Sequence, residues 1–141
     1  MNEYYYEDIE VGKKESFTVT VTASMLDAFK DISGDVNPLH CNEDFAKKEG
    51  YEGRVAYGML TASFLSALAG VYLPGKYSLI QSVEIKFAKP VYIGDELTVT
   101  GEVIEKNDTF GLIIIKVSIT SSSGNKVCRG KMQIGVKQRT A

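Results

Sequence analysis

The chain has 141 residues, a length typical of one domain that can bury a core without disulfide or metal support. Its 16 Lys and Arg against 18 Asp and Glu give a formal net charge of -2, which provides no bulk attraction to nucleic acid or to an anionic membrane. The two cysteines, Cys41 and Cys128, lack the CxxC spacing of a zinc site or a redox pair. We therefore expect one domain over residues 1–141, in a reducing cytoplasmic setting and without a metal.

The first predicted elements are one strand and one short helix. Residues 16–22, SFTVTVT, alternate apolar and polar side chains, as a half-buried strand does. Residues 23–34, ASMLDAFKDISG, have helical periodicity, with Thr22 or Ser24 as the starting cap and Gly34 as the stop. The apolar face of this helix is predicted to consist of Leu26, Phe29 and Ile32.

Two further helices are predicted before the second half of the chain. Residues 42–50, NEDFAKKEG, form a short helix with Asn42 as the N-cap and Gly50 as the stop. Residues 57–70, YGMLTASFLSALAG, are apolar on nearly every side, which indicates a helix surrounded by protein. The uncharged stretch around it, residues 55–75, approaches the length of a bilayer span, but polar residues and Pro74 interrupt it. We expect a buried helix and no membrane association.

The second half of the chain predicts strands that pack around this helix. Four segments repeat with a period of two, and the turn SSSGN separates the last two of them. These segments are residues 82–90, 96–103, 111–120 and 131–137. A central apolar helix followed by long strands indicates an α+β domain, in which a curved antiparallel sheet wraps around one helix.

The stretch SGDVNPLH contains the only histidine of the chain, His40, five residues after Asp35. Histidine accepts and donates protons near neutral pH, and a nearby carboxylate can orient it or share a water molecule with it. The amide of Gly58 begins the apolar helix, where an N–H without an intrahelical partner lies at the positive end of the helix dipole. A base, an acid and such a donor are what the addition of water to a double bond conjugated to a thioester requires.

These residues resemble a known family. SGDVNPLH, YGML some seventeen residues later, LPGK and KPVYIGDELT are similar to motifs of the MaoC-like dehydratases, in particular the (R)-specific enoyl-CoA hydratases. The resemblance covers about residues 22–103. It implies a hot-dog fold and the reversible addition of water to a trans-2-enoyl thioester, giving an (R)-3-hydroxyacyl thioester. It implies no cofactor.

The resemblance also implies roles for individual residues. Asp35 and His40 correspond to the family's catalytic pair, and which of them is base and which is acid stays open. Asn37 corresponds to a residue that holds the loop, and Ser63 to a serine near the pair. The backbone N–H of Gly58 corresponds to the group that binds the thioester carbonyl.

Two positions depart from the family pattern. Tyr57 stands where a histidine usually precedes Gly-Met-Leu, and Asn42 stands where an aspartate is frequent. Tyr57 is beside the expected carbonyl-binding amide, so we expect its ring to contact the acyl group and to influence the choice of acyl length.

Other interpretations of the same residues remain open. Asp35 and Asn37 could simply cap the turn before Pro38, and Ser63 could bond to the carbonyl one turn back in its helix. Cys41 next to His40 suggests a nucleophile, but no second base is apparent. Two alternatives to a hydratase remain. One is a hot-dog thioesterase with Asp35 as the hydrolytic carboxylate, and the other is a non-catalytic acyl-thioester-binding protein.

The expected partners follow from the resemblance and from the charges. The substrate is a thioester of CoA or of an acyl carrier protein, and scattered cations could meet either the CoA phosphates or an acidic carrier. These cations are Lys76, Lys86, Lys89 and Arg129. A hot-dog sheet has an exposed edge strand, which proteins cover or pair, so we expect a homodimer.

Overall fold

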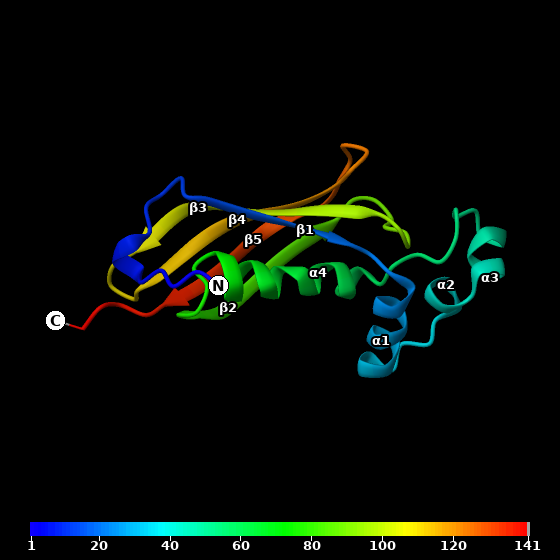
Figure 1. Ribbon diagram of the computed structural model, residues 1–141, viewed down its shortest axis with the longest axis horizontal. Coiled ribbons are helices and arrows are strands. Elements are labelled where there is room, and N and C mark those ends of the chain that lie inside the picture. Colours follow the sequence, from blue (N-terminus) through cyan, green and yellow to red (C-terminus); the bar gives the residue numbers. More distant parts are fainter. Residues whose placement is uncertain (141) are drawn as a thin grey trace.

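The computed structural model describes residues 1–140, and Ala141, the last residue of the predicted domain, lies outside the described residues. Long alternating segments form a five-stranded antiparallel sheet with the strand order β1-β3-β4-β5-β2 (Figure 1). The strands are β1 (Lys14–Thr20), β2 (Ser78–Phe87), β3 (Glu96–Asn107), β4 (Leu112–Ser121) and β5 (Lys126–Val136). Strands β1 and β2 are therefore the two edges of the sheet.

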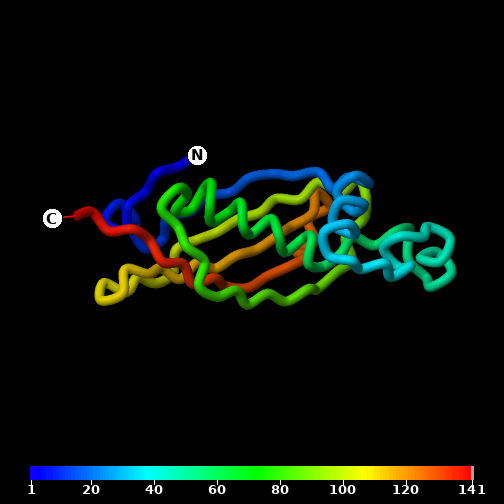
Figure 2. The backbone as a smooth tube through the Cα atoms, turned by 90° about the horizontal axis from the view of Figure 1, so that it is seen from below, coloured from blue at the N-terminus to red at the C-terminus, as the bar shows by residue number. Residues whose placement is uncertain are grey.

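Helix α4 (Gly58–Ala67) lies across one face of this sheet and continues into a π-helical turn, η2 (Leu68–Tyr72) (Figure 2). Leu65 and Leu68 are buried against alternate side chains of the strands, such as Val99 and Ile115. Gly101 permits the close approach, because a Cβ there would lie 3.1 Å from the Leu68 side chain. The predicted α+β arrangement, an antiparallel sheet around one apolar helix, is confirmed.

Two of the predicted strands begin earlier than their periodicity indicates. Strand β2 starts at Ser78 instead of residue 82, and β5 starts at Lys126 instead of residue 131. A register shift interrupts the β2–β5 pairing between Ile80 and Ser82, and another interrupts the β4–β5 pairing near Thr120. Such irregularities break the alternation of buried and exposed side chains locally. A prediction based on a period of two therefore missed the first residues of both strands.

The remaining helices lie beyond one end of the sheet, away from both termini (Figures 1 and 2). They are α1 (Ala23–Ser33), α2 (Pro38–Cys41) and α3 (Glu43–Lys48), while a short 3-10 turn, η1 (Tyr6–Asp8), precedes β1. The caps agree with prediction: Thr22 accepts a hydrogen bond from the amide of Met25, Asn42 caps α3, and Gly34 ends α1 with a φ of 76°. The four-residue helix α2 was not predicted.

Two predictions of burial were wrong. Ile32 is 83% exposed, because α1 projects past the sheet and only the side that carries Leu26 reaches the core. Helix α4 is not surrounded on all sides, since Met59 is 65% exposed. Apolar side chains of edge strand β2 are exposed as well, at Leu79, Ile80, Val83 and Phe87.

Among residues 1–140, no helix combines the length and hydrophobicity needed to cross a bilayer.

Candidate active site

The loop between α1 and α2 is built by side chains that cap its turns. The carboxylate of Asp35 accepts a hydrogen bond of 3.0 Å from the amide of Asn37, and Asn37 Oδ1 accepts one of 3.0 Å from the amide of Leu39. Asn37 is thus the N-cap of α2, with Pro38 as its first residue. These caps place His40 at the third position of α2, the helix that Asn37 caps.

The imidazole of His40 has a defined orientation. Its Nδ1 lies 2.6 Å from the carbonyl oxygen of Val55. A carbonyl oxygen only accepts hydrogen bonds, so Nδ1 carries the hydrogen and the lone pair of the neutral ring lies on Nε2. The ring also stacks on Tyr57 with 4.2 Å between centroids. His40 is therefore held in a tautomer whose Nε2 can act as a base.

Tyr57 connects the His40 ring to the Asp35 segment. Its side chain is 2% exposed, and its hydroxyl donates a hydrogen bond of 2.7 Å to the backbone carbonyl of Asp35. The same hydroxyl lies 3.3 Å from Cys41 Sγ, and its ring packs against Phe29. Burial, followed by the contact with Cys41, raises the pKa of Tyr57, so the hydroxyl stays protonated and remains a donor.

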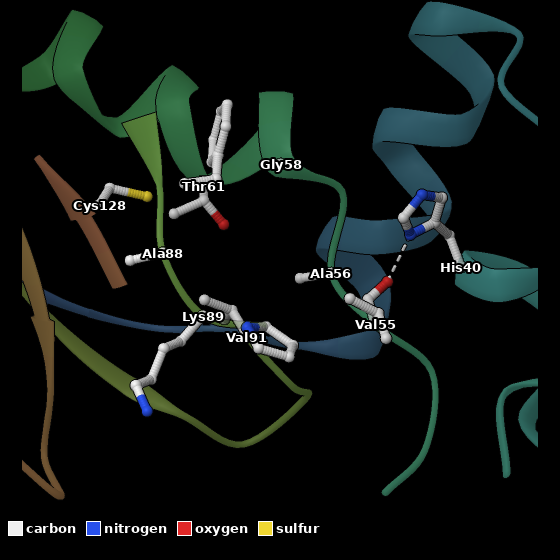
Figure 3. Close-up of a pocket in the computed structure, with 11 residues that line it drawn as sticks. His40, Val55, Ala56, Gly58, Thr61, Ala88, Lys89, Val91 and Cys128 are labelled. Carbon is white, nitrogen blue, oxygen red and sulfur yellow. Dashed lines mark hydrogen bonds between the residues drawn. The ribbon is translucent and has the colours of Figure 1, made fainter. Parts of the chain in front are cut away.

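A cavity of about 300 Å³ lies between the start of α4, the end of β2 and the beginning of β5 (Figure 3). The side chains that give it chemical character are His40, Thr61, Phe87, Lys89 and Cys128, and the backbone of Gly58 also borders it. Residues 55, 56, 88, 90 and 91 complete an apolar wall. The cavity thus combines one histidine, one helix terminus and an apolar lining, as a site for an acyl thioester would.

Gly58 is the first residue of α4, so its N–H has no partner within the helix. A Cβ at this position would lie 3.2 Å from Cε1 of Phe87, which is closer than an ordinary contact. The glycine therefore leaves room beside its amide, at the positive end of the helix, for the oxygen of a ligand.

Of the residues singled out by sequence, the structure brings His40 and Gly58 to the same cavity. Asp35, Asn37, Tyr57 and Ser63 do not line it. Asp35 is exposed in the capping loop, and Tyr57 packs behind the His40 ring. The Ser63 hydroxyl donates a hydrogen bond of 2.5 Å to the carbonyl of Leu60. This is the local helical bond that the sequence left open as the alternative to a role in the site.

The sequence interpretation missed two polar or reactive side chains at the cavity, Thr61 and Cys128, and named Lys89 only as one of the cations that could meet a carrier phosphate. Thr61 follows Gly58 by three residues, a spacing that puts both on one side of a helix and was the available signal. Lys89 and Cys128 come from segments that only the fold brings together. Burial raises the pKa of the Cys128 thiol to about 11, so it stays protonated and is a poor nucleophile at neutral pH. Within residues 1–140, no cluster of His, Cys, Asp or Glu could hold a metal ion.

Several known proteins are similar to this chain in sequence and in fold. A family model described as MaoC like domain matches residues 8–125. An (R)-specific enoyl-CoA hydratase of Rhodospirillum rubrum is 42% identical over 107 residues, covering 73% of this chain and 74% of the relative. An (R)-specific enoyl-CoA hydratase of Aeromonas caviae is 33% identical over 125 residues, covering 89% of this chain and 93% of the relative.

Two solved structures give the same result. The R-hydratase PhaJ1 from Pseudomonas aeruginosa, in its unliganded form, superimposes with a TM-score of 0.91 at 30% identity. The match covers 96% of this chain and 86% of that chain. The (R)-hydratase from A. caviae, described as involved in PHA biosynthesis, superimposes with a TM-score of 0.89 at 32% identity, covering 92% of this chain and 98% of that chain. The sequence and the hot-dog architecture thus agree that the chain belongs to the MaoC-like domain family.

Proposed function

We propose that this protein is a hydratase that adds water reversibly to a trans-2-enoyl thioester and forms the (R)-3-hydroxyacyl thioester. The observation that carries the proposal is the meeting of His40 and the Gly58 amide at one apolar cavity. Relatives named (R)-specific enoyl-CoA hydratase, at 42% and 33% identity, support the same reaction.

The proposed reaction uses the groups at and beside this cavity. His40 Nε2 takes a proton from water, and the water oxygen forms a bond to C3 of the enoyl group. The electrons of the double bond move toward the thioester carbonyl, whose oxygen gains negative charge and accepts a hydrogen bond from the Gly58 N–H. C2 then receives a proton from the acid–base pair, which gives up the equivalent of the proton taken from water, so the pair returns to its starting state and the 3-hydroxyacyl product is complete. The reaction consumes one water and needs no redox step.

We assign Asp35 as the partner of His40, as the family resemblance implies. Two observations support this: Tyr57 donates a hydrogen bond to the Asp35 backbone and also stacks on the His40 ring, and the Asp35 side chain is exposed to solvent. Asp35 is then the group that shares the water or delivers the proton to C2.

Hydrolysis of the thioester is less well supported. A hot-dog thioesterase would need Asp35 as a hydrolytic carboxylate at the carbonyl carbon, whereas three relatives that match most of this chain are named as enoyl-CoA hydratases or a 3-hydroxybutyryl-CoA dehydratase. A binding protein without activity would not require a histidine held in one tautomer by Val55. The hydratase relatives point in the same direction.

The substrate is proposed to be a CoA thioester, with an acyl carrier protein thioester as the second candidate. Three of the first relatives are named for CoA substrates. Lys89 is exposed and borders the cavity, so it can bind a phosphate of the carrier group. A cytoplasmic location, which the two free cysteines favour, remains a prediction.

We further propose a homodimer that forms through strand β2. Within residues 1–140, this edge strand pairs only with β5 and exposes Leu79, Val83 and Phe87, an arrangement that favours association with a second chain. Phe87 also lines the cavity, so the partner would border the site. A second copy of the same edge gives a symmetric interface.

The direct test is incubation of the purified protein with crotonyl-CoA and longer trans-2-enoyl-CoAs. Loss of the enoyl absorbance without release of free thiol, with the (R)-3-hydroxyacyl product on chiral analysis, is the expected result. Release of thiol at the same rate would indicate a thioesterase. Binding without any chemical change would indicate a non-catalytic protein.

A further inference from the structure

Thr61 is almost completely buried, with an exposed fraction of 2%. Within residues 1–140, all the other side chains buried to this degree are apolar, tyrosine or cysteine side chains. It lines the cavity that His40 and Gly58 border. A buried hydroxyl is unfavourable by about 1 to 3 kcal/mol unless it has a partner, so its retention at this place calls for a function.

The hydroxyl of Thr61 is directed toward the cavity. Figure 3 shows its oxygen on the side away from the α4 ribbon, pointing into the space between Ala88 and Ala56. Within residues 1–140, no buried side-chain oxygen or nitrogen is both sealed from solvent and without a hydrogen-bond partner. The Thr61 hydroxyl has no bond to a described residue, unlike that of Ser63, and therefore opens onto the cavity.

Thr61 and Gly58 share one side of the helix. They are three residues apart, and helical side chains lean toward the amino terminus, so the Thr61 hydroxyl approaches the end where the Gly58 N–H is exposed. Much of the remaining lining of the cavity is apolar, including Phe87, Ala88 and Val91. A hydrogen bond formed in such surroundings is stronger than one in water.

We propose that the Thr61 hydroxyl is a second hydrogen-bond donor to the thioester carbonyl, beside the Gly58 amide. This inference rests on the proposed hydratase function. During addition of water to C3, the carbonyl oxygen gains negative charge, and the hydroxyl donates its hydrogen bond to that oxygen without losing its proton. Thr61 is thus a substrate-contacting residue, and a chain with valine at this position would retain only the amide donor.

The test compares native protein with Thr61→Val, which removes the hydroxyl at equal volume, and Thr61→Ser, which keeps it. Hydration of crotonyl-CoA should fall ~10²-fold in kcat for the valine variant, the usual result of removing one such donor, and should stay within ~10-fold of native for the serine variant. Thr100→Val, on the opposite face of the sheet, is the matched control and should have native activity.

A second readout reports on the carbonyl itself. The ultraviolet absorption of 2,4-hexadienoyl-CoA shifts to longer wavelength when its carbonyl is polarised, so the bound compound should show a smaller shift in Thr61→Val than in native protein or in Thr61→Ser. A merely structural threonine would lower the melting temperature without changing this shift. If Thr61→Val does not fold, Thr61→Ala is measured per folded molecule with the same expectation.

The outcomes separate this inference from the function on which it rests. A native protein that hydrates no enoyl thioester would overturn the proposed function and the Thr61 role together. An active native protein whose Thr61→Val variant has the same kcat, or a lower kcat with an unchanged absorption shift, would overturn the Thr61 role alone. A lower kcat together with a smaller shift supports it.

Discussion

The Tyr57 hydroxyl donates a 2.7 Å hydrogen bond to the backbone carbonyl of Asp35, and the Tyr57 ring stacks on His40. One buried side chain thus positions both members of the proposed catalytic pair. In this protein the residue lies behind the pair and outside the cavity lining, in contrast to the expectation that its ring contacts the acyl group.

Tyr57→Phe should keep the ring stack and lose the bond to Asp35. We expect a loss of about 1 kcal/mol in the free energy of unfolding, because one hydrogen bond is removed. We also expect hydration to fall by ~10- to 10²-fold, because the loop is no longer held in place. The ratio of rates on two acyl lengths should not change. Tyr5→Phe, which removes a hydroxyl bonded to Tyr77 elsewhere, is the control. A changed length preference would place the Tyr57 ring in the acyl pocket after all.

Gly58→Ala tests the need for space beside the carbonyl-binding amide. The added Cβ lies 3.2 Å from the Phe87 ring and occupies the side on which the thioester oxygen must approach. Phe87 is half-exposed and can move, and alanine favours helix, so the melting temperature should change little. Hydration should fall ~10²-fold, as expected for a displaced reacting group. Native activity in this variant would show that the oxygen binds elsewhere.

Ionisation of Tyr6 is expected to lower the free energy of unfolding at high pH. Burial, then the hydrogen bond from its hydroxyl to Asp108, raises the pKa of Tyr6 to about 12 from 10.0. The folded protein therefore holds this proton more tightly than the unfolded chain, so the stabilisation is complete below pH 10 and is lost as the pH rises toward 12. Urea midpoints should fall more steeply between pH 10 and pH 12 in native protein than in Tyr6→Phe. Parallel curves for the two proteins would contradict this.

The proposed dimer predicts a difference between two equivalent substitutions. Val83→Lys places a charge on exposed edge strand β2, and Val11→Lys places one on an exposed turn at the other side of the sheet. In sedimentation at micromolar concentration, native protein and Val11→Lys should be dimers, whereas Val83→Lys should be largely monomeric. A native monomer, or a Val83→Lys dimer of unchanged stability, would rule out association through β2.

The fold was readable from sequence where one periodicity runs unbroken. Strand β3 alternates buried Leu97 and Val99 with half-exposed Thr98 and Thr100, so its period of two was clear there, whereas its last residues, 104–107, follow a register shift and were not predicted. The start of β5 was missed because neighbouring Val127 and Cys128 are both buried, next to a register shift. The exposure of Ile32 could not be seen either, since it depends on where α1 lies relative to the sheet.

The candidate site was predictable only to the extent that it is local. The capping roles of Asn37 and Asn42 follow from short-range hydrogen bonds and were correctly placed. The contacts of His40 with the Val55 carbonyl and of Tyr57 with Asp35 join segments that are 15 and 22 residues apart, and no spacing rule specifies them. Thr61 was overlooked because a single threonine in an apolar helix looks structural until a cavity is found beside it.

The most direct measurement is the rate of crotonyl-CoA hydration by native protein, His40→Ala, Asp35→Asn and the double variant. Each single change should lower kcat by ~10²- to 10⁴-fold, the usual contribution of a positioned acid or base. The double variant should be no slower than the worse single variant, because loss of either partner already disables the shared step. Substrate affinity should survive in all three. A folded His40→Ala protein that hydrates crotonyl-CoA at the native rate would contradict the proposed mechanism.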